Sequence, residues 1–264
     1  MTIEEILQSH HNFAVEKGKG EYEVVFTYVN GSQNYNLSDE LSDVDTISVV
    51  VPAFKRIVYN NTNVYATHDL VNGLVVVEDL NHFFYHRLCN GSLTGMEALF
   101  TQYYITSEDY KMEVLRLRAN ADMISRAYKN KFIIATRGLL ASMEARMRNP
   151  NLKYYNEEFG YNTKMLATAR YAQYLLEHVI SGFTIRDTIM VPDNQKNYFI
   201  NLKRGLTKEE NPSFTQTYLL CDDAITDMEP IGAPLSEEGD AECLVVDTLT
   251  DCYRICLSNT MEEP

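Results

Sequence analysis

The pattern of apolar and polar positions divides the chain into a β-rich first part and a helical second part. Residues 21–30, 44–51 and 74–78 are short runs rich in Val, Ile, Tyr and Phe, a composition typical of strands. Apolar side chains at helical spacing predict helices over 2–16 and 80–88. The first part therefore predicts an α/β (α+β) core in which a small β-sheet is flanked by helices.

The second part has the texture of long helices. Residues 108–148 contain no Pro and a single Gly, with apolar residues at helical intervals, so we expect one bent helix or two joined helices. Further helices are predicted over 162–181 and 193–204, with a β-like stretch at 183–191 between them. We expect three parts, namely an α/β core at 1–106, a helical domain at 107–212 and an acidic segment at 213–264 that packs on the body.

Charge is distributed unevenly along the chain. The formal net charge of −14 argues against broad binding to nucleic acid, because polyanions are repelled. Residues 111–153 nevertheless hold ten basic against three acidic residues, whereas fourteen acidic residues and one Arg follow from Glu209 onward. The basic segment is therefore expected either to pair with the acidic one or to line a groove for a phosphate-bearing acceptor.

Cysteine usage and hydropathy favour a cytoplasmic protein. The five cysteines are odd in number and form no Cys-x-x-Cys pair, which is typical of reduced structural thiols, and the last four match no common zinc spacing. No stretch approaches the ~20 apolar residues of a membrane helix, and the acidic start is unlike a secretory signal.

The chemistry is concentrated between Gly31-Ser32 and Asp43-Val44-Asp45. Alternation along a strand puts Asp43 and Asp45 on one face, where two carboxylates repel each other unless a cation lies between them. Mg²⁺ or Mn²⁺ suits such oxygen ligands and keeps substrate phosphates in its shell. Gly31 permits close approach of the backbone to a ligand, and Ser32 can begin a helix whose free N–H groups face an anion. A turn rich in Asp and Ser at a strand start is the plain alternative.

A third carboxylate beside this pair would let the site hold a second metal ion. The acidic residues near the third β-rich run are Asp69, Glu78 and Asp79. Strand alternation alone does not choose among them, because Glu78 and Asp79 lie on opposite faces.

These residues resemble the signature of the DNA polymerase β-type nucleotidyltransferase superfamily. In that family a Gly-Ser pair is followed by an Asp-x-Asp step on the next strand, as in Gly31-Ser32 and Asp43-Val44-Asp45 here. The wider pattern is similar to predicted bacterial and phage-encoded nucleotidyltransferases of an RNA-repair type. Its further landmarks, over Tyr28 to Phe100 and more weakly over 161–170, are Tyr35, Asp79-Leu80, Asn90, Glu97-x-Leu99, Lys164 and Arg170. Asn36 and Asn90-Gly91 stand where the subgroup has Gly and Asn-Pro.

The resemblance implies a small mixed sheet as a catalytic core that moves an NMP from an NTP, such as ATP, to a hydroxyl with release of pyrophosphate. The acceptor it suggests is an RNA 3′ end, a protein side chain or a small molecule. It favours Asp79 as the third acid. The implied site residues are Asp43, Asp45 and Asp79 for the metal and catalysis, and Gly31, Ser32, Tyr35, Lys164 and Arg170 for the nucleotide. The alternative is a catalytically silent protein of this fold that binds a nucleotide or inhibits a partner protein.

Overall fold

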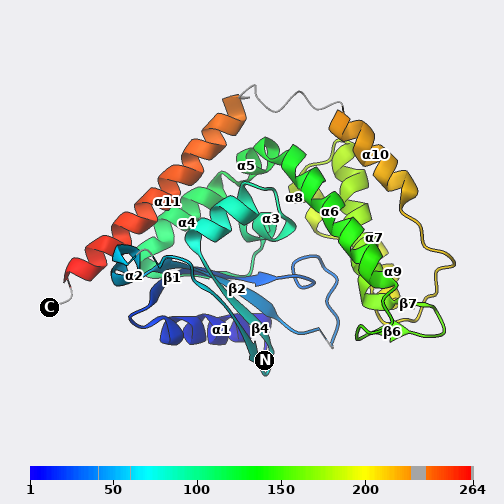
Figure 1. The fold of residues 1–264 in the computed structure, drawn as a ribbon, viewed down its shortest axis with the longest axis horizontal. Helices are drawn as coiled ribbons and strands as arrows, with labels where there is room; N and C mark the ends of the chain where they lie inside the picture. Colours follow the sequence, from blue (N-terminus) through cyan, green and yellow to red (C-terminus); the bar gives the residue numbers. More distant parts are fainter. Residues whose placement is uncertain (41, 60, 227–235, 263–264) are drawn as a thin grey trace.

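The sheet has five strands in the order β3–β4–β2–β1–β5 (Figure 1). In this computed structural model, which describes residues 1–40, 42–59, 61–226 and 236–262, β2 and β4 pair in parallel and the other neighbours are antiparallel. The strands are β1 (Tyr22–Asn30), β2 (Asp45–Pro52), β3 (Tyr65–Leu70), β4 (Gly73–Asp79) and β5 (Tyr104–Thr106). The sheet is mixed and a helical half follows it, which confirms the predicted α+β class.

One face of the sheet is covered by α1 (Ile3–Gly18). The helix begins with a capping box, in which Thr2 accepts from the Glu5 N–H and the Glu5 carboxylate accepts from the Thr2 N–H. Its own His10 and His11 are buried against the sheet, where their Nδ1 atoms lie 3.0 Å from the hydroxyls of Thr46 and Thr27 respectively. This face therefore carries buried polar pairs as well as apolar contacts.

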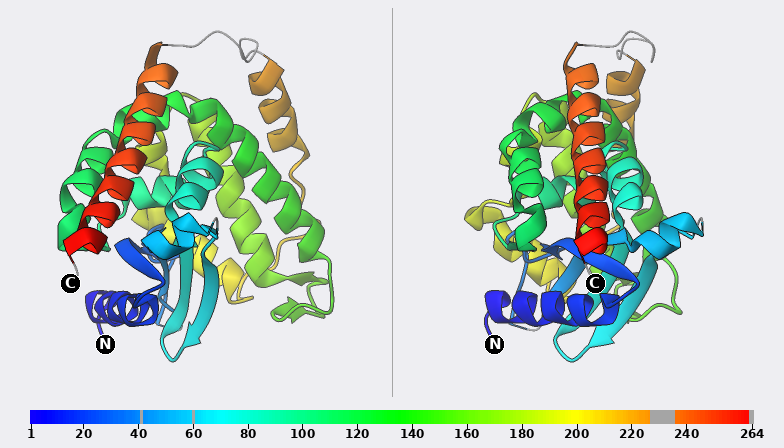
Figure 2. Two further views of the ribbon diagram at one scale, coloured as in Figure 1. Left: turned by 60° about the vertical axis from the view of Figure 1, so that its left-hand side comes forward. Right: turned by 90° about the vertical axis from the view of Figure 1, so that its left-hand side faces the viewer.

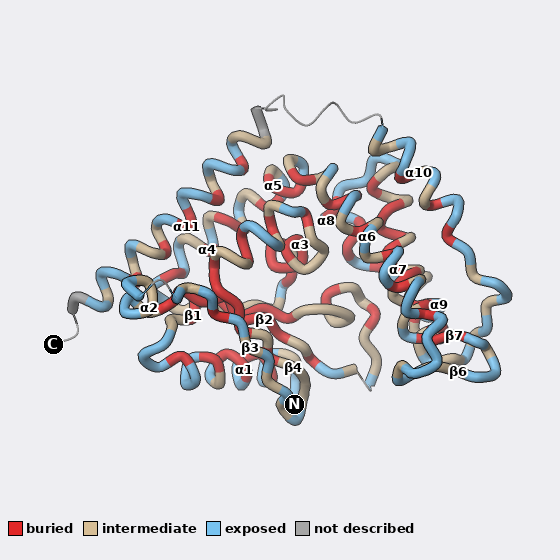
Figure 3. Tube along the Cα trace, viewed as in Figure 1, coloured by how far each residue is buried: buried red, intermediate tan, exposed pale blue. Residues whose placement is uncertain are grey.

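The opposite face of the sheet packs against the rest of the body. η1 (His82–Leu88), a π-helix where a regular helix was expected, and α3 (Leu93–Phe100) follow β4 and bury Phe83 and Met96 against β1 and β2. The short α2 (Phe54–Val58) connects β2 to the edge strand β3. The main core therefore lies between the sheet and the helices above it (Figure 3).

The helical half is more broken than the sequence predicts. η2 (Glu108–Tyr110) leads into α4 (Lys111–Ala119), α5 (Ala121–Ala127) and α6 (Lys129–Met147), three α-helices where one or two were expected. Asn120 and Tyr128 interrupt the run with φ near −100° and ψ near 15°, so each ends one helix and starts another. The run ends at Met147, one residue before the expected limit of 148.

The β-like stretch at 183–191 is instead the short helix α8 (Ile185–Ile189). Thr184 caps it through the Asp187 N–H, and Ile185, Thr188 and Ile189 are buried together at helical spacing. β-branched residues misled the prediction, because tertiary packing and the cap outweigh strand propensity over five residues. The neighbouring helices α7 (Thr163–Ile180) and α9 (Asp193–Lys203) match the predicted ones, and β6 (Tyr155–Asn156) and β7 (Tyr161–Asn162) form a small hairpin before α7.

The acidic segment lies along the basic one. α10 (Thr215–Thr226) and α11 (Ser236–Glu262) run beside the helical half, as both views of Figure 2 show; residues 227–235 and 263–264 lie outside the described residues. Ion pairs between the described residues of the two segments include Arg116–Asp251, Lys131–Glu238 and Arg137–Asp222. Across the described ranges, no helix has both the length and the apolar character needed to cross a bilayer.

Candidate functional site

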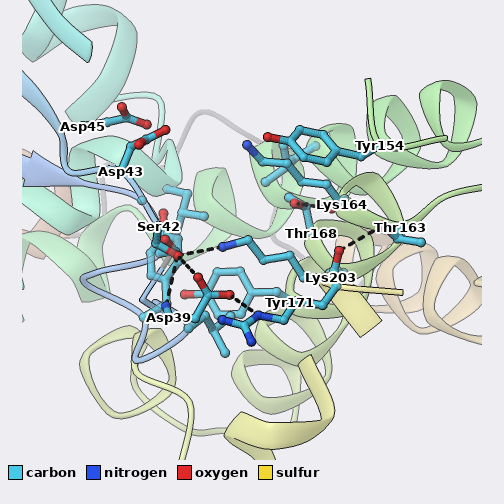
Figure 4. A pocket seen from close by; sticks show the side chains of 18 of the residues that line it. Asp39, Ser42, Asp43, Asp45, Tyr154, Thr163, Lys164, Thr168, Tyr171 and Lys203 are labelled. Carbon is cyan, nitrogen blue, oxygen red and sulfur yellow. Dashed lines mark hydrogen bonds and ion pairs between the residues drawn. The ribbon is translucent and has the colours of Figure 1, made fainter. Parts of the chain in front are cut away.

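A cleft of about 1340 Å³ separates the sheet from α6, α7 and α9. One wall comes from the end of β1, the loop after it and the start of β2; the other comes from the β6–β7 hairpin, α7 and the end of α9 (Figure 4). Of the residues predicted for the site, the cleft is lined by Gly31, Ser32, Tyr35, Asp43, Asp45 and Lys164.

The Gly31-Ser32 step forms a tight turn at the end of β1. Gly31 has φ of +89°, in the left-handed region that favours glycine. The turn is closed by Asn34 N–H donating to the Gly31 carbonyl at 2.9 Å and Leu37 N–H donating to the Ser32 carbonyl at 3.0 Å. No helix follows in residues 31–37, so the expected helix N-terminus is replaced by a hydrogen-bonded turn. Asn36 takes φ of +62°, which explains how it replaces the Gly of the related pattern.

Glu97 of α3 holds this turn from beneath. Its side chain is fully buried, and one carboxyl oxygen accepts the Gly31 N–H at 3.1 Å. The other oxygen has no hydrogen-bond partner among the described residues. Burial raises the pKa of Glu97 well above its ordinary value, while the Gly31 N–H opposes the rise, so we treat this group as a neutral carboxyl. In the sequence Glu97 is one landmark of the family resemblance, and its contact with Gly31 was not predicted.

The carboxylate pair stands beside the turn. Asp43 is exposed in the loop before β2, and Asp45 is the first residue of that strand, opposite Asn30 of β1. One Asp45 oxygen accepts the Leu74 N–H of β4 at 3.0 Å, which fixes the carboxylate at the cleft edge. Figure 4 shows the two carboxylates next to each other, facing the opposite wall.

The oxygen atoms here suit a hard divalent cation. Besides the two carboxylates, the amide oxygen of Asn30 is buried without a hydrogen-bond partner among the described residues, and Asn30 also lines the cleft. Mg²⁺ and Mn²⁺ favour carboxylate and amide oxygens, and Mg²⁺ sites are commonly completed by substrate phosphates. Asp43, Asp45 and Asn30 therefore fit such an ion.

Asp79 does not join the pair, contrary to the expectation. It is level with Val50 in the parallel β2–β4 register, five residues beyond Asp45, or ~16 Å along the strand. Five is an odd number, so Asp79 also belongs to the face covered by α1 rather than to the face of Asp45. Its carboxylate instead accepts the His82 N–H at 2.9 Å at the start of η1.

The other two candidates for the third acid also lie away from the pair. Glu78 is fully buried and ion-paired with Arg87, whose Nε lies 2.7 Å from the carboxylate. Asp69 is exposed on the edge strand β3 and level with Leu74, hence two strand spacings or ~10 Å from Asp45. No group of three Asp, Glu, His or Cys side chains in the described part of the chain is placed to hold a metal ion.

The opposite wall is cationic. Lys164 is exposed near the start of α7, and Lys203 and Arg204 come from the end of α9. Lys203 donates to the Ser42 hydroxyl at 3.0 Å, and Arg204 pairs with Asp39 at 2.9 Å, so the end of α9 is tied to the loop that carries Asp43. Burial lowers the pKa of Lys203; nearby Lys164 lowers it too, while Asp39 raises it. The wall thus carries two ammonium groups whose charges influence each other, and such a pair favours binding of an anion.

Arg170 is not part of this wall. Its guanidinium donates to the Glu209 carboxylate, with Nε to oxygen at 3.0 Å, and lies 4.6 Å from the centre of the Phe214 ring. These contacts point it away from the cleft, because position 170 is on a different face of α7 from position 164. Arg170 therefore lies outside the cleft in which the resemblance implied that it binds the nucleotide.

The basic segment at 111–153 is also largely absent from the cleft. Arg116, Lys131 and Arg137 pair with carboxylates of α10 and α11. Arg118 donates to the carbonyls of Ala98 and Thr101. The cations that do line the cleft come from later positions, which the sequence count did not single out except Lys164. Lys203 is the functional candidate that sequence reasoning missed, and its place at a helix end before Gly205 was the available signal.

Comparisons with known proteins add little to this geometry. No family profile matches the chain, and no curated protein does. Among solved structures, the chain is similar to the crystal structure of a nucleotidyltransferase-like protein from Exiguobacterium sibiricum, with 11% identity and a TM-score of 0.30. The aligned part covers 96% of this chain and 75% of that one. A likeness this slight carries no argument, so functional reasoning rests on the cleft itself.

Proposed function

We propose that this protein is a metal-dependent nucleotidyltransferase that moves an NMP from an NTP to a hydroxyl and releases pyrophosphate. The observation that carries the proposal is one cleft with two chemically opposite walls. A carboxylate pair beside a Gly-Ser turn stands on one side, and Lys164 and Lys203 stand on the other. A ligand in this cleft can be bound through a divalent cation on the carboxylates and through its negative charge on the lysines. A nucleoside triphosphate with its divalent cation uses both kinds of contact.

The acidic and basic residues of the cleft have different roles in this proposal. A bound Mg²⁺ or Mn²⁺ would supply positive charge to the triphosphate and the attacking oxygen. Asp43 and Asp45, with the Asn30 amide oxygen, would hold it. Lys164 and Lys203 would neutralise the charge that grows on the leaving pyrophosphate.

The reaction balances without a third carboxylate. The acceptor hydroxyl oxygen forms the new bond to the α-phosphorus, and the α–β phosphoanhydride bond breaks. The hydroxyl proton passes to solvent, since none of the three sequence candidates for a further acid lies beside Asp43 and Asp45. Glu97 acts indirectly, because it fixes the Gly31 peptide that shapes the turn.

The acceptor is proposed in the order RNA 3′ end, protein side chain and small molecule. The net charge of −14 and the pairing of the basic segment with the acidic one disfavour a long duplex. A short or single-stranded end that enters the cleft needs only the few cations found there.

The test is transfer of label from each α-³²P NTP, with Mg²⁺ or Mn²⁺, to a mixture of total RNA and protein. We expect transfer by the natural chain and a loss of at least 100-fold in Asp43→Asn and Asp45→Asn, since a missing charge in such a centre costs ~3 kcal/mol or more. Asp79→Asn and Asp69→Asn are the matched controls and should retain transfer, because both carboxylates lie away from the pair.

Two outcomes would contradict the proposal. Transfer that survives in both Asp43→Asn and Asp45→Asn would show that the pair is not the catalytic centre. Absence of transfer and of pyrophosphate release with every NTP, together with tight NTP or protein binding, would favour the catalytically silent alternative.

A further inference from the structure

Tyr154 occupies an unusual position on the cationic wall. It lies just before the β6–β7 hairpin, lines the cleft, and stands across from Asp43 and Asp45 in Figure 4. Half of the residue, 50%, is exposed. Its backbone has φ of +73°, where a bulky L-residue is strained.

The surrounding structure holds Tyr154 in that conformation. The Thr163 N–H donates to the Tyr154 carbonyl at 3.1 Å, and the side chain of Asn162 donates to the Lys153 carbonyl at 2.7 Å. Asn162 is itself fully buried and caps α7 through the Met165 N–H. The start of α7 therefore fixes both peptides that flank Tyr154, and strain that is overdetermined in this way commonly accompanies function.

Two cations flank the ring. The Lys153 ammonium lies 5.0 Å from the ring centre and the Lys164 ammonium 5.4 Å from it. An aromatic face beside ammonium groups matches a nucleotide, whose base stacks on the ring while its phosphate pairs with a cation. The same Lys164 faces the triphosphate in the proposed reaction.

The other tyrosines of the cleft are already engaged. The rings of Tyr35 and Tyr171 pack on each other with centres 4.4 Å apart, and Tyr171 is buried with its hydroxyl bonded to the Ile189 carbonyl. Tyr155 is only partly exposed. Among the described tyrosines that line the cleft, Tyr154 is therefore the most exposed.

We infer that Tyr154 is a stacking platform that receives the nucleobase of a substrate, with the adjacent phosphate of that substrate on Lys164. The inference deepens the proposed function and rests on it for the identity of the ligand as a nucleotide. It makes Tyr154 a specificity-determining residue for a base-bearing ligand. That base belongs either to the NTP donor or to a single-stranded nucleic-acid acceptor, and the two sources separate experimentally.

The experiment is calorimetric binding with Ca²⁺ in place of Mg²⁺, using the four NTPs, a 5′-phosphorylated tetraribonucleotide and inorganic tripolyphosphate. Tyr154→Leu removes the ring, and Tyr154→Phe keeps it. Tyr85→Leu is the matched control, because Tyr85 is 48% exposed but lies on η1 outside the cleft. Tyr154→Gly, which suits the backbone at φ +73°, serves as the second ring-less variant should the Leu variant be unfolded.

We expect Tyr154→Leu to weaken binding of a base-bearing ligand by roughly 5- to 150-fold, the range of one lost base–aromatic stack. Tyr154→Phe and Tyr85→Leu should bind like the natural chain, and tripolyphosphate should bind all four proteins alike. Weakened NTP binding assigns the base to the donor, and weakened tetranucleotide binding alone assigns it to the acceptor.

The inference is overturned if both base-bearing ligands keep their affinity in Tyr154→Leu, if tripolyphosphate binding falls equally, or if the natural chain binds neither. Its failure is distinct from that of the proposed function. If nucleotide binding depends on Tyr154 but no label is transferred, the stacking role of Tyr154 is supported and the proposal of nucleotidyl transfer is contradicted.

Discussion

Glu97→Gln tests whether a neutral, buried carboxyl lies beneath the Gly-Ser turn. Glu97 is fully buried, bonds the Gly31 N–H through one oxygen, and has a pKa raised by burial. Glutamine keeps an oxygen for that N–H and carries no charge at any pH. The substitution therefore removes the titration while retaining the shape and the hydrogen bond.

The magnitude follows from proton linkage. In the unfolded chain Glu97 loses its proton near pH 4.3, whereas in the folded protein the proton stays bound to a higher pH. The folded state then binds more protons than the unfolded state, so the contribution of Glu97 is complete below the unfolded pKa and is lost as pH rises through the folded pKa. Within that window the natural chain loses about 1.4 kcal/mol of its free energy of unfolding per pH unit relative to Glu97→Gln.

The measurement is urea unfolding of both proteins at pH 5, 6, 7 and 8. The difference between their free energies of unfolding should grow in favour of Glu97→Gln and level off at the folded pKa of Glu97. A constant offset of about 1 kcal/mol from the new amide does not change with pH. Glu4→Gln, at an exposed position of α1, should give a difference with no such slope. A flat difference for Glu97→Gln from pH 5 to pH 8 would refute the neutral buried carboxyl.

Two further predictions concern the cationic wall and the buried histidines. Lys203→Met should weaken tripolyphosphate binding about 10-fold, measured by calorimetry, because one of the two lysines on the cationic wall is lost. Lys208→Met changes an exposed lysine that pairs with Glu210 at 3.4 Å and is the control; equal loss in both variants would contradict a specific role of Lys203. Burial lowers the pKa of His10 and His11, with Asp45 opposing the shift at His10, so their contribution to stability is present above the unfolded pKa near 6.5 and lost as pH falls through the folded pKa values. His10→Asn/His11→Asn should therefore unfold in urea with a weaker dependence on acid than the natural chain below pH 6.5, and an unchanged dependence would show that neither histidine is kept neutral.

Local chemistry explains the parts of the fold that the sequence predicts correctly. The capping box at Thr2, the cap at Asn162 and the apolar periodicity of α7 and α9 each act over a few residues, so they can be read one segment at a time. The failures lie where packing overrules local preference. The β-branched stretch in α8 and the breaks at Asn120 and Tyr128 are such cases.

The candidate site divides in the same way. Gly31, Ser32, Asp43 and Asp45 are close in sequence, and a strand, a turn and a second strand suffice to bring them together. Their grouping was therefore available from spacing alone. The opposite wall is built from positions more than 100 residues away, and apart from Lys164, which the resemblance implied, no local pattern marks them as neighbours of the pair.

Short segments of the sequence specify the carboxylate wall of the cleft, because glycine at φ +89° and an alternating carboxylate pair are local properties of the chain. The other features of the site follow from tertiary packing. The β2–β4 register places Asp79 about five residues along the strand from Asp45. Arg170 is ion-paired with Glu209. Several side chains of the basic segment are ion-paired with the acidic helices α10 and α11. Packing of α7 and α9 against the loop then brought Lys203 and Tyr154 to the cleft in their place. Strand register and ion pairs between distant segments are set by the assembled fold, so the neighbours of a residue in the sequence do not determine them.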